Sequence, residues 1–247
     1  MSYFIFNGIN SDNLGLIITK PMIRPTWSQE VAYTAIPGRA RQSQYTQPWY
    51  NNAELTASAV IADASPQKVR SIYAALRGSG TLVISTSPYE RINVADVRLP
   101  VPEAKALLVA ELPITFVCEP FAESTEQSTA DITTAISIPA RVDNNGTQYV
   151  DPEITIIPST SSTDINCNGK VIFVATPTTI VTANYPANAK VVLDCEGQLA
   201  YYQIGDGDKI ACTQNTQGPF PRLNVGENYF LSTSAQSVIL RYRERWL

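Results

Sequence analysis

Short apolar and polar stretches alternate along almost the whole chain, and this pattern predicts β-strands. Turn residues separate the stretches. Asn7-Gly8 is a favoured dipeptide for a two-residue hairpin turn, and residues 143–146 hold a second strong turn signal. The expected strands cover residues 3–6, 14–19, 54–61, 81–86, 92–99 and 106–117, and then 150–157, 171–174, 179–182, 190–195, 199–204 and 237–246.

Prolines limit several of these strands. Pro21 and Pro25 exclude their segment from a central strand, because proline cannot donate a hydrogen bond to the ladder. For the same reason we expect Pro113 to interrupt the apolar run 106–117. We also expect Pro120 to stop the pairing of the strand piece that follows Pro113.

Only residues 66–77 carry a clear helical pattern. Ser65 suits the N-cap and Pro66 the first helical position, while Gly78 suits a left-handed C-terminal cap. Apolar residues recur between these signals at the spacing of one helix face. This stripe consists of Val69, Ile72, Tyr73 and Leu76.

A segment rich in Ser, Thr and acidic residues divides the chain. Residues 123–135 hold almost no large apolar side chain, so we interpret them as a linker. The expected domains are 1–122, with the helix, and 136–247, with strands and turns alone. The predicted fold class is mainly β, with an N-terminal β-sandwich-like domain and a C-terminal β-sandwich.

Composition excludes several kinds of chemistry. The 247 residues carry a net charge of −4 and contain no histidine. Catalytic systems of the Ser-His-Asp and Cys-His kinds and histidine-containing zinc sites are therefore excluded, and a duplex-DNA binder is disfavoured. The start of the chain lacks the pattern of a secretory signal, and no apolar run is long enough for a membrane helix. The four cysteines form no CxxC pair, so we expect buried free thiols.

Two carboxylate pairs are the remaining candidates for chemistry. Asp194 with Glu196 could serve a glycosidase, since residues two apart on a strand share a face. Asp206 with Asp208 resembles the start of a calcium loop but lacks the downstream glutamate. Acidic residues beside glycine are also typical of plain turns. We therefore expect no enzyme activity, no catalytic residue, no metal site and no cofactor.

Aromatic residues interrupt the polar segment 42–52. Tyr45, Trp49 and Tyr50 could cover the edge of their own sheet, or they could contact another subunit. Near the other end of the chain, every second residue is an arginine: Arg241, Arg243 and Arg245. On one strand they would share a face, which is either solvated or a patch that meets an acidic partner.

Four tyrosines in the second half, Tyr149, Tyr185, Tyr201 and Tyr202, could stack on sugar rings. Adjacent tyrosines on a strand are more often one core residue and one surface residue. They motivate the alternative function, a carbohydrate-binding β-sandwich module.

The opening segment resembles the N-terminus of the distal tail proteins (Dit) of long-tailed bacteriophages. The matching pieces are Phe6-Asn7-Gly8, Ser11, Leu14-Gly15-Leu16, Arg24-Pro25 and Ile36-Pro37-Gly38-Arg39. Ala40 and Arg41 stand where the family often has a further glycine. Residues 114–121 resemble the strand that closes the N-terminal domain of that family, with its F-x-C-x-P-F pattern.

The second half resembles the galectin-like C-terminal sandwich of the same family. The matching pieces are Asn145-Gly146-Thr147 with Pro152, Val192-Leu193-Asp194, Gly218-Pro219-Phe220-Pro221-Arg222-Leu223, Gly226-Glu227-Asn228 and the closing run 241–246. Residues 159–168 and 204–217 lie outside the resemblance. A galectin-type sugar site needs a histidine, so that site cannot be complete here.

The resemblance implies a structural protein of a phage or prophage tail tip. It implies a hexameric ring with the N-terminal domains around a channel through which the genome can pass. This ring would join the tail tube protein to a tail-associated lysin, fibre or receptor-binding protein, in a virion made in the host cytoplasm. It also implies that residues 42–52 form a hairpin that reaches the next protomer, which makes Arg39, Tyr45, Trp49 and Tyr50 candidate contacts between subunits.

Overall fold

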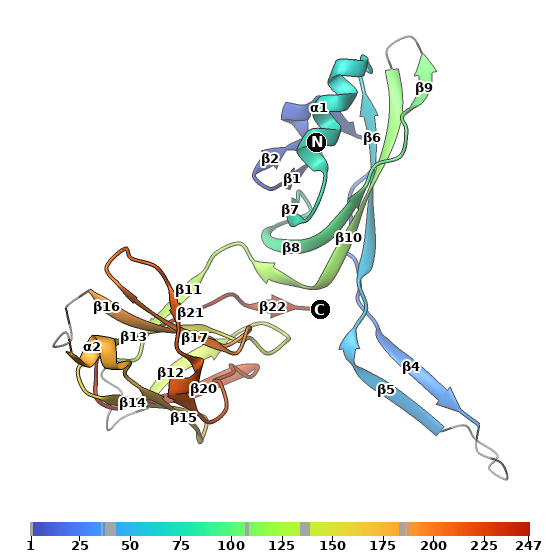
Figure 1. Ribbon diagram of the computed structural model, residues 1–247. Coiled ribbons are helices and arrows are strands. Elements are labelled where there is room, and N and C mark those ends of the chain that lie inside the picture. The colour runs from blue at the N-terminus through green and yellow to red at the C-terminus, as the bar shows by residue number, and fades with distance from the viewer. Residues whose placement is uncertain are drawn as a thin grey trace. The chain divides into compact units, whose positions relative to one another are not determined.

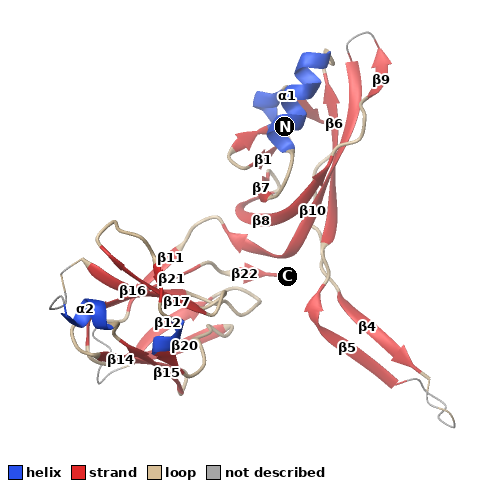
Figure 2. Cartoon of the chain, in the orientation of Figure 1, coloured by secondary structure: helices blue, strands red, loops and turns tan. Residues whose placement is uncertain are grey.

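The computed structural model describes residues 2–247 except 36, 38–42, 107–108, 134–138, 183–185 and 187. These residues form two compact units (Figure 1). Unit 1 comprises the described residues up to Thr125 together with Leu247, and unit 2 comprises those from Glu126 to Trp246. The predicted mainly β fold class is confirmed, and strands dominate both units (Figure 2).

Unit 1 is built on one curled sheet. Its strand order is β2-β1-β7-β8-β10-β6-β3, and β9 pairs with β10. The strands are β1 (Phe4–Phe6), β2 (Ile9–Asn10), β3 (Leu16–Ile18), β6 (Ala53–Ile61), β7 (Gly80–Ile84), β8 (Ser87–Arg98), β9 (Glu103–Ala106) and β10 (Val109–Ser124). The predicted turn at Asn7-Gly8 is present, with positive φ at both residues. It leads into β2, which was not predicted, and the strand expected at 14–19 is β3, which pairs with β6.

The helix of unit 1 begins where the sequence places it. Helix α1 (Pro66–Leu76) has Ser65 at its N-cap, and Gly78 beyond it has a φ of 88°. Ile72 and Leu76 are fully buried in the core of unit 1. The strands β1, β3, β6, β7, β8 and β10 also contribute to this core, with Phe4, Phe6, Leu16, Ile61, Leu82, Ile84, Ile92, Leu112, Ile114 and Phe116.

Strand β10 corrects two expectations about proline. It runs through Pro113, which faces Ser58 on β6. Along its opposite edge, β10 pairs with β9 as far as Glu111 and with β8 from Thr115 onwards, so no described strand pairs with Pro113 on that edge. The missing N–H of Pro113 therefore costs no hydrogen bond of the ladder.

Pro120 does not end pairing either. The register of β10 with β8 shifts between Cys118 and Ala122, and Phe121 has a φ of 74°. Pro120 lies in a β-bulge, where its missing N–H is not needed for pairing. The pairing of β10 with β8 continues to Ser124.

Unit 2 is a sandwich of two antiparallel sheets with a shared core. One sheet has the order β11-β21-β13-β16-β17-β18, and the other has the order β12-β20-β14-β15-β19. The first sheet contains β11 (Ser128–Asp131), β13 (Glu153–Pro158), β16 (Ala189–Asp194), β17 (Leu199–Ile204), β18 (Ile210–Ala211) and β21 (Ala235–Tyr242). The second contains β12 (Ala140–Asn144), β14 (Ser162–Cys167), β15 (Lys170–Ala175), β19 (Thr216–Gln217) and β20 (Gly226–Ser232).

Three expectations for the second half need correction. The expected strand at 179–182 is the short helix α2 (Thr178–Thr182), with Ile180 buried in the core. The closing strand is broken into β21 and β22 (Arg245–Trp246). The expected linker contains β11, which pairs with β21, because its small polar residues fit an edge strand as well as a loop. The boundary between the units lies between Thr125 and Glu126.

Candidate functional surfaces

The first candidate surface is the ribbon made by β4 (Gln29–Thr34) and β5 (Ser43–Tyr50). These strands pair only with each other among the described residues, and Figure 1 shows them apart from the sheet of unit 1. Tyr45 lies opposite Ala32, and Tyr33 lies opposite Gln44. Because neighbouring residues of a strand point to opposite faces, the two tyrosines lie on different faces of the ribbon.

The aromatic residues of this ribbon have different surroundings. Tyr33, Tyr45 and Trp49 are 63, 61 and 54% exposed. Tyr50, at the base, contacts Phe121 edge to face with 5.2 Å between ring centroids. Tyr50 therefore anchors the base of the ribbon to β10, whereas Tyr45 and Trp49 are accessible to another chain. Arg39 lies outside the described residues.

An isolated two-stranded ribbon is marginally stable in water. Both outer edges of this ribbon present backbone groups that no other described strand pairs, and its faces present aromatic rings. Unpaired edges and exposed aromatic residues are typical of surfaces that pair with another chain.

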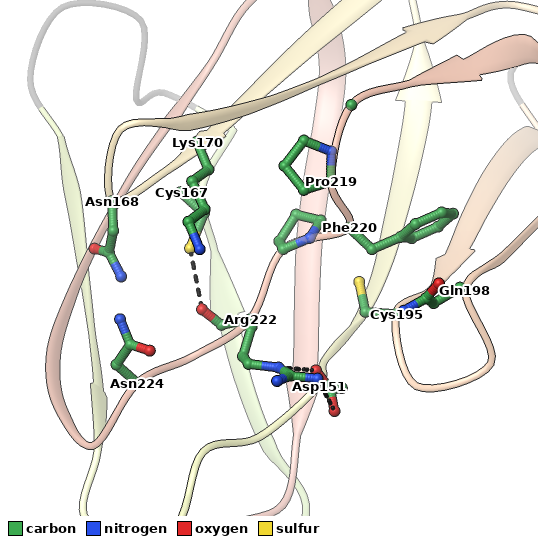
Figure 3. A pocket seen from close by; sticks show the side chains of 12 residues that line it. Asp151, Cys167, Asn168, Lys170, Cys195, Gln198, Pro219, Phe220, Arg222 and Asn224 are labelled. Carbon is green, nitrogen blue, oxygen red and sulfur yellow. Dashed lines mark hydrogen bonds and ion pairs between the residues drawn. The ribbon is translucent and has the colours of Figure 1, made fainter. Parts of the chain in front are cut away.

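The second candidate surface is a groove of about 580 Å³ in unit 2 (Figure 3). Its walls come from the turn between β14 and β15, the turn between β16 and β17, and the segment before Leu223. The lining residues are Asp151, Cys167, Asn168, Lys170, Cys195, Gln198, Gly218, Pro219, Phe220, Pro221, Arg222 and Asn224.

Arg222 is held on three sides in this groove. Its guanidinium donates to Asp151 at 2.7 and 3.4 Å, and it lies 4.0 Å from the ring centroid of Tyr149. Its backbone carbonyl accepts from the Cys167 thiol at 3.5 Å. Asp151 is therefore neutralised locally, since its side chain is only 11% exposed and faces the guanidinium.

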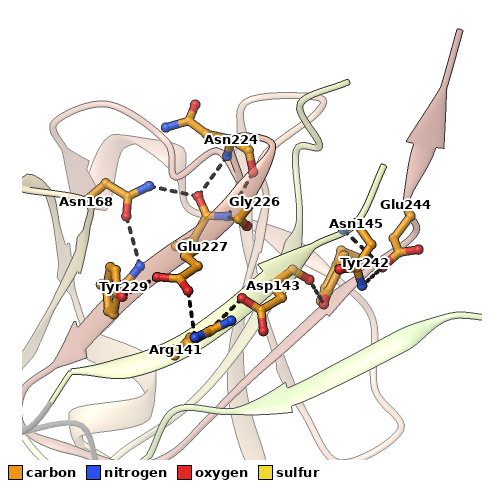
Figure 4. A network of polar contacts seen from close by, with 11 residues as sticks. Arg141, Asp143, Asn145, Asn168, Asn224, Gly226, Glu227, Tyr229, Tyr242 and Glu244 are labelled. Atoms are coloured by element: carbon orange, nitrogen blue, oxygen red, sulfur yellow. Dashed lines mark hydrogen bonds and ion pairs between the residues drawn. The ribbon is translucent and has the colours of Figure 1, made fainter. Parts of the chain in front are cut away.

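A buried amide, Asn228, organises the rim of the groove. Figure 4 labels its partners Asn168, Asn224 and Gly226. Its Oδ1 accepts from Asn168 Nδ2 and from the Asn224 backbone N–H, both at 2.8 Å. Its Nδ2 donates to the carbonyls of Asn224 and Gly226 at 2.9 and 3.0 Å. One side chain thus fixes two of the residues that line the groove.

Replacing this amide should destabilise unit 2. Asn228→Ala leaves buried donors and acceptors without partners, so we expect a loss of about 2–3 kcal/mol in the free energy of unfolding. Urea unfolding followed by circular dichroism measures it. Asn145→Ala is the control: Asn145 is exposed and its side chain donates one surface hydrogen bond, to Glu244, so its loss should cost about 1 kcal/mol or less. Equal losses in both variants would contradict this role of Asn228.

The first carboxylate pair, Asp194 and Glu196, has structural partners. Asp194 accepts from the Gly197 N–H at 3.0 Å within a turn, and Glu196 pairs with Arg245 at 2.6 Å. Arg241 lies 3.5 Å from Glu153. Within the part of the chain that the structure describes, no group of three or more His, Cys, Asp or Glu residues could hold a metal ion. Among the same residues, no helix is long and apolar enough to cross a membrane.

The four cysteines are buried free thiols. Burial raises the pKa of Cys118 to about 12 and those of Cys167 and Cys212 to about 11. It also raises the pKa of Cys195. Thiols with such values carry almost no thiolate near neutral pH, so these residues act as small apolar groups.

Of the tyrosines proposed to stack on sugars, the three described ones each have different contacts. Tyr201 lies under the Lys209 ammonium at 4.5 Å, and the hydroxyl of Tyr202 lies 3.4 Å from that of Thr179. Neither lines the groove. Tyr149 contacts Arg222, and Tyr185 lies outside the described residues.

Comparison with known proteins identifies the fold. No protein-family model and no curated relative matches the sequence. Among solved structures, the Dit protein of phage SPP1 aligns over 100% of both chains, with a TM-score of 0.74 and 16% identity. The chain has the Dit fold. That structure is described as a paradigm of the hub adsorption apparatus of phages that infect Gram-positive bacteria.

A second structure supports the same fold. A chain of the phage P2 baseplate, in its activated conformation with Ca, aligns over 98% of this chain and 97% of its own. The TM-score is 0.52 and the identity is 8%. The resemblance to Dit proteins found in the sequence is therefore confirmed at the level of fold. The alignment with SPP1 Dit includes both units, so neither one is an addition to the Dit architecture.

Proposed function

We propose that the chain is a non-enzymatic structural protein of a phage or prophage tail tip. The observation that carries this proposal is the match of the whole chain to the Dit hub protein of SPP1. A hub is a junction between other proteins, and a structural role agrees with carboxylates that hold turns and salt bridges and with thiols that are buried. The protein would be made in the host cytoplasm and act in the tail tip of the virion.

The proposed assembly is a hexameric ring. Head-to-tail contacts between identical chains close into a ring when the rotation between neighbours permits it. The β4–β5 ribbon of one protomer would contact unit 1 of the next and cover Tyr45 and Trp49. Unit 1 would surround the channel for the genome, and unit 2 would face outwards.

The partners proposed for the ring are other tail proteins. One side would meet the tail tube protein, and the other a tail-associated lysin, fibre or receptor-binding protein. The contact with DNA would be passage through the channel without sequence recognition, which agrees with the net charge of −4.

Polar substitutions in the ribbon test the proposed contact. In the double variant Tyr45→Ser, Trp49→Ser we expect the protomer to fold normally and the ring to dissociate at concentrations at least about 100-fold higher than for the unchanged protein. The reason is that buried aromatic anchors contribute about 2 kcal/mol or more each at interfaces. Light scattering after size exclusion measures the mass, and thermal unfolding checks the fold.

Tyr89→Ser is the matched control. Tyr89 is 80% exposed but lies on β8, outside the ribbon, so its loss should leave assembly unchanged. A double variant that assembles as well as the control would refute the contact assigned to the ribbon.

A further inference from the structure

The groove of unit 2 is built before any ligand arrives. Gly218 has a φ of 104°, and a Cβ there would lie 2.3 Å from the carbonyl oxygen of Val171. Only glycine therefore allows the segment that carries Pro219 and Phe220 to pass so close to β15. Val150 and Leu223 exchange two backbone hydrogen bonds of 2.9 and 2.8 Å, which fix the end of that segment. Together with the three contacts of Arg222, these features hold the wall in place.

The groove also presents polar groups that no other described residue uses. The Lys170 ammonium and the side-chain amides of Gln198 and Asn224 make no hydrogen bond or ion pair within the described residues. Figure 3 shows Lys170 and Asn224 on one side of the groove and Gln198 on the other. Groups of this kind on opposite walls are what a small polar ligand requires.

The charges of the lining define the ligand further. Asp151 and Arg222 neutralise each other, which leaves the single positive charge of Lys170. Amides that both donate and accept suit hydroxyl groups, and the ring of Phe220 and the flanking prolines supply an apolar surface. A volume of about 580 Å³ lies within the range of small-molecule sites.

We propose that this groove binds a saccharide with an acidic substituent. The acidic group pairs with Lys170, the hydroxyls bond to Gln198 and Asn224, and the face of the sugar ring lies against Phe220. Cys167 and Cys195 line the groove, but they are buried with raised pKa values and form part of its inert wall. This site lies within unit 2 and does not depend on the proposed ring.

A glycan array probed with the full-length protein tests the proposal. The array carries oligosaccharides with uronate, sialate or phosphate groups, each beside its neutral counterpart. We expect binding to at least one acidic member and at least fivefold weaker binding to its counterpart. Calorimetry with that member should show about tenfold weaker binding for Lys170→Gln, since a charge-assisted hydrogen bond is lost. Lys190→Gln, an equal change on β16 away from the groove, should bind normally.

Three results would overturn the proposal. The first is no binding to any member at millimolar concentration. The second is equal binding by the Lys170→Gln and Lys190→Gln variants. The third is complete competition by inorganic phosphate at the concentration of the saccharide itself, which would show a simple anion site.

Discussion

Replacing Phe116 by alanine should bring unit 1 close to unfolding while unit 2 stays folded. Phe116 is fully buried on β10, with its ring centroid 5.2 Å from that of Phe4 and 5.8 Å from that of Phe6. Deleting a buried phenylalanine side chain costs about 3–5 kcal/mol, because apolar contacts are lost and a cavity is left. A domain has only about 5–15 kcal/mol in total. The transition of unit 1 should therefore move down by roughly 10 °C or more in calorimetry.

Phe230→Ala is the matched control for this prediction. Phe230 is equally buried, but it lies on β20 in the core of unit 2. We expect this variant to lower the second transition and leave the first in place. If either variant shifted both transitions equally, the two cores would not be independent, contrary to the division at Thr125 and Glu126.

The second large effect is expected for Arg91→Ala. Arg91 lies opposite Glu123 on the neighbouring strand and donates two hydrogen bonds, of 2.7 and 3.2 Å, to its carboxylate. Glu123 is only 5% exposed. Removing the guanidinium deletes both of these charge-assisted hydrogen bonds to a buried carboxylate, at a cost of about 3 kcal/mol in the stability of unit 1. Urea unfolding measures this cost.

An exposed ion pair on the same sheet supplies the control. Arg98 pairs with Glu54, and both side chains are more than half exposed. Arg98→Ala should therefore cost less than about 1 kcal/mol. The double variant Arg91→Ala, Glu123→Ala should be more stable than Arg91→Ala alone, because it removes the buried charge as well. Equal costs for Arg91→Ala and Arg98→Ala would contradict the role given to burial.

The local features of the fold could be predicted from the sequence. Helix α1 begins at Pro66 because a proline suited to the first helical position and an apolar stripe favour the same start. Ser65 occupies the N-cap position, but its side chain makes no capping hydrogen bond. The Asn7-Gly8 turn was predictable for a similar reason, since it needs positive φ at two adjacent residues. Such features depend only on neighbours in the chain.

Features that depend on distant strands could not be predicted. Pro113 is compatible with a continuous strand only because neither β8 nor β9 pairs at that level. The segment of α2 reads as a strand because it is rich in β-branched residues, yet packing of Ile180 in the core of unit 2 is compatible with a short helix. Local propensity is a weak guide to secondary structure where tertiary contacts determine it.

The subunit contacts expected at Tyr45, Trp49 and Tyr50 stay a prediction, and the structure shows only which of these rings are exposed. The aromatic residues at 45 and 49 were identified, but the sequence could not separate them from Tyr50, which contacts Phe121. The groove was missed, because its walls come from segments far apart in the chain. One local signal was available: Asn168-Gly169 has the composition of a tight hairpin turn, and it joins the strands that carry Cys167 and Lys170.

The most direct test of the proposed tail-tip role is the mass of the purified chain as a function of concentration. Light scattering after size exclusion gives this mass, and negative-stain images of the largest species show its shape. We expect closed rings with the mass of a hexamer of the 27.0-kDa chain, increasingly populated as concentration rises. A monomeric mass at every concentration, with no ring in the images, would contradict it.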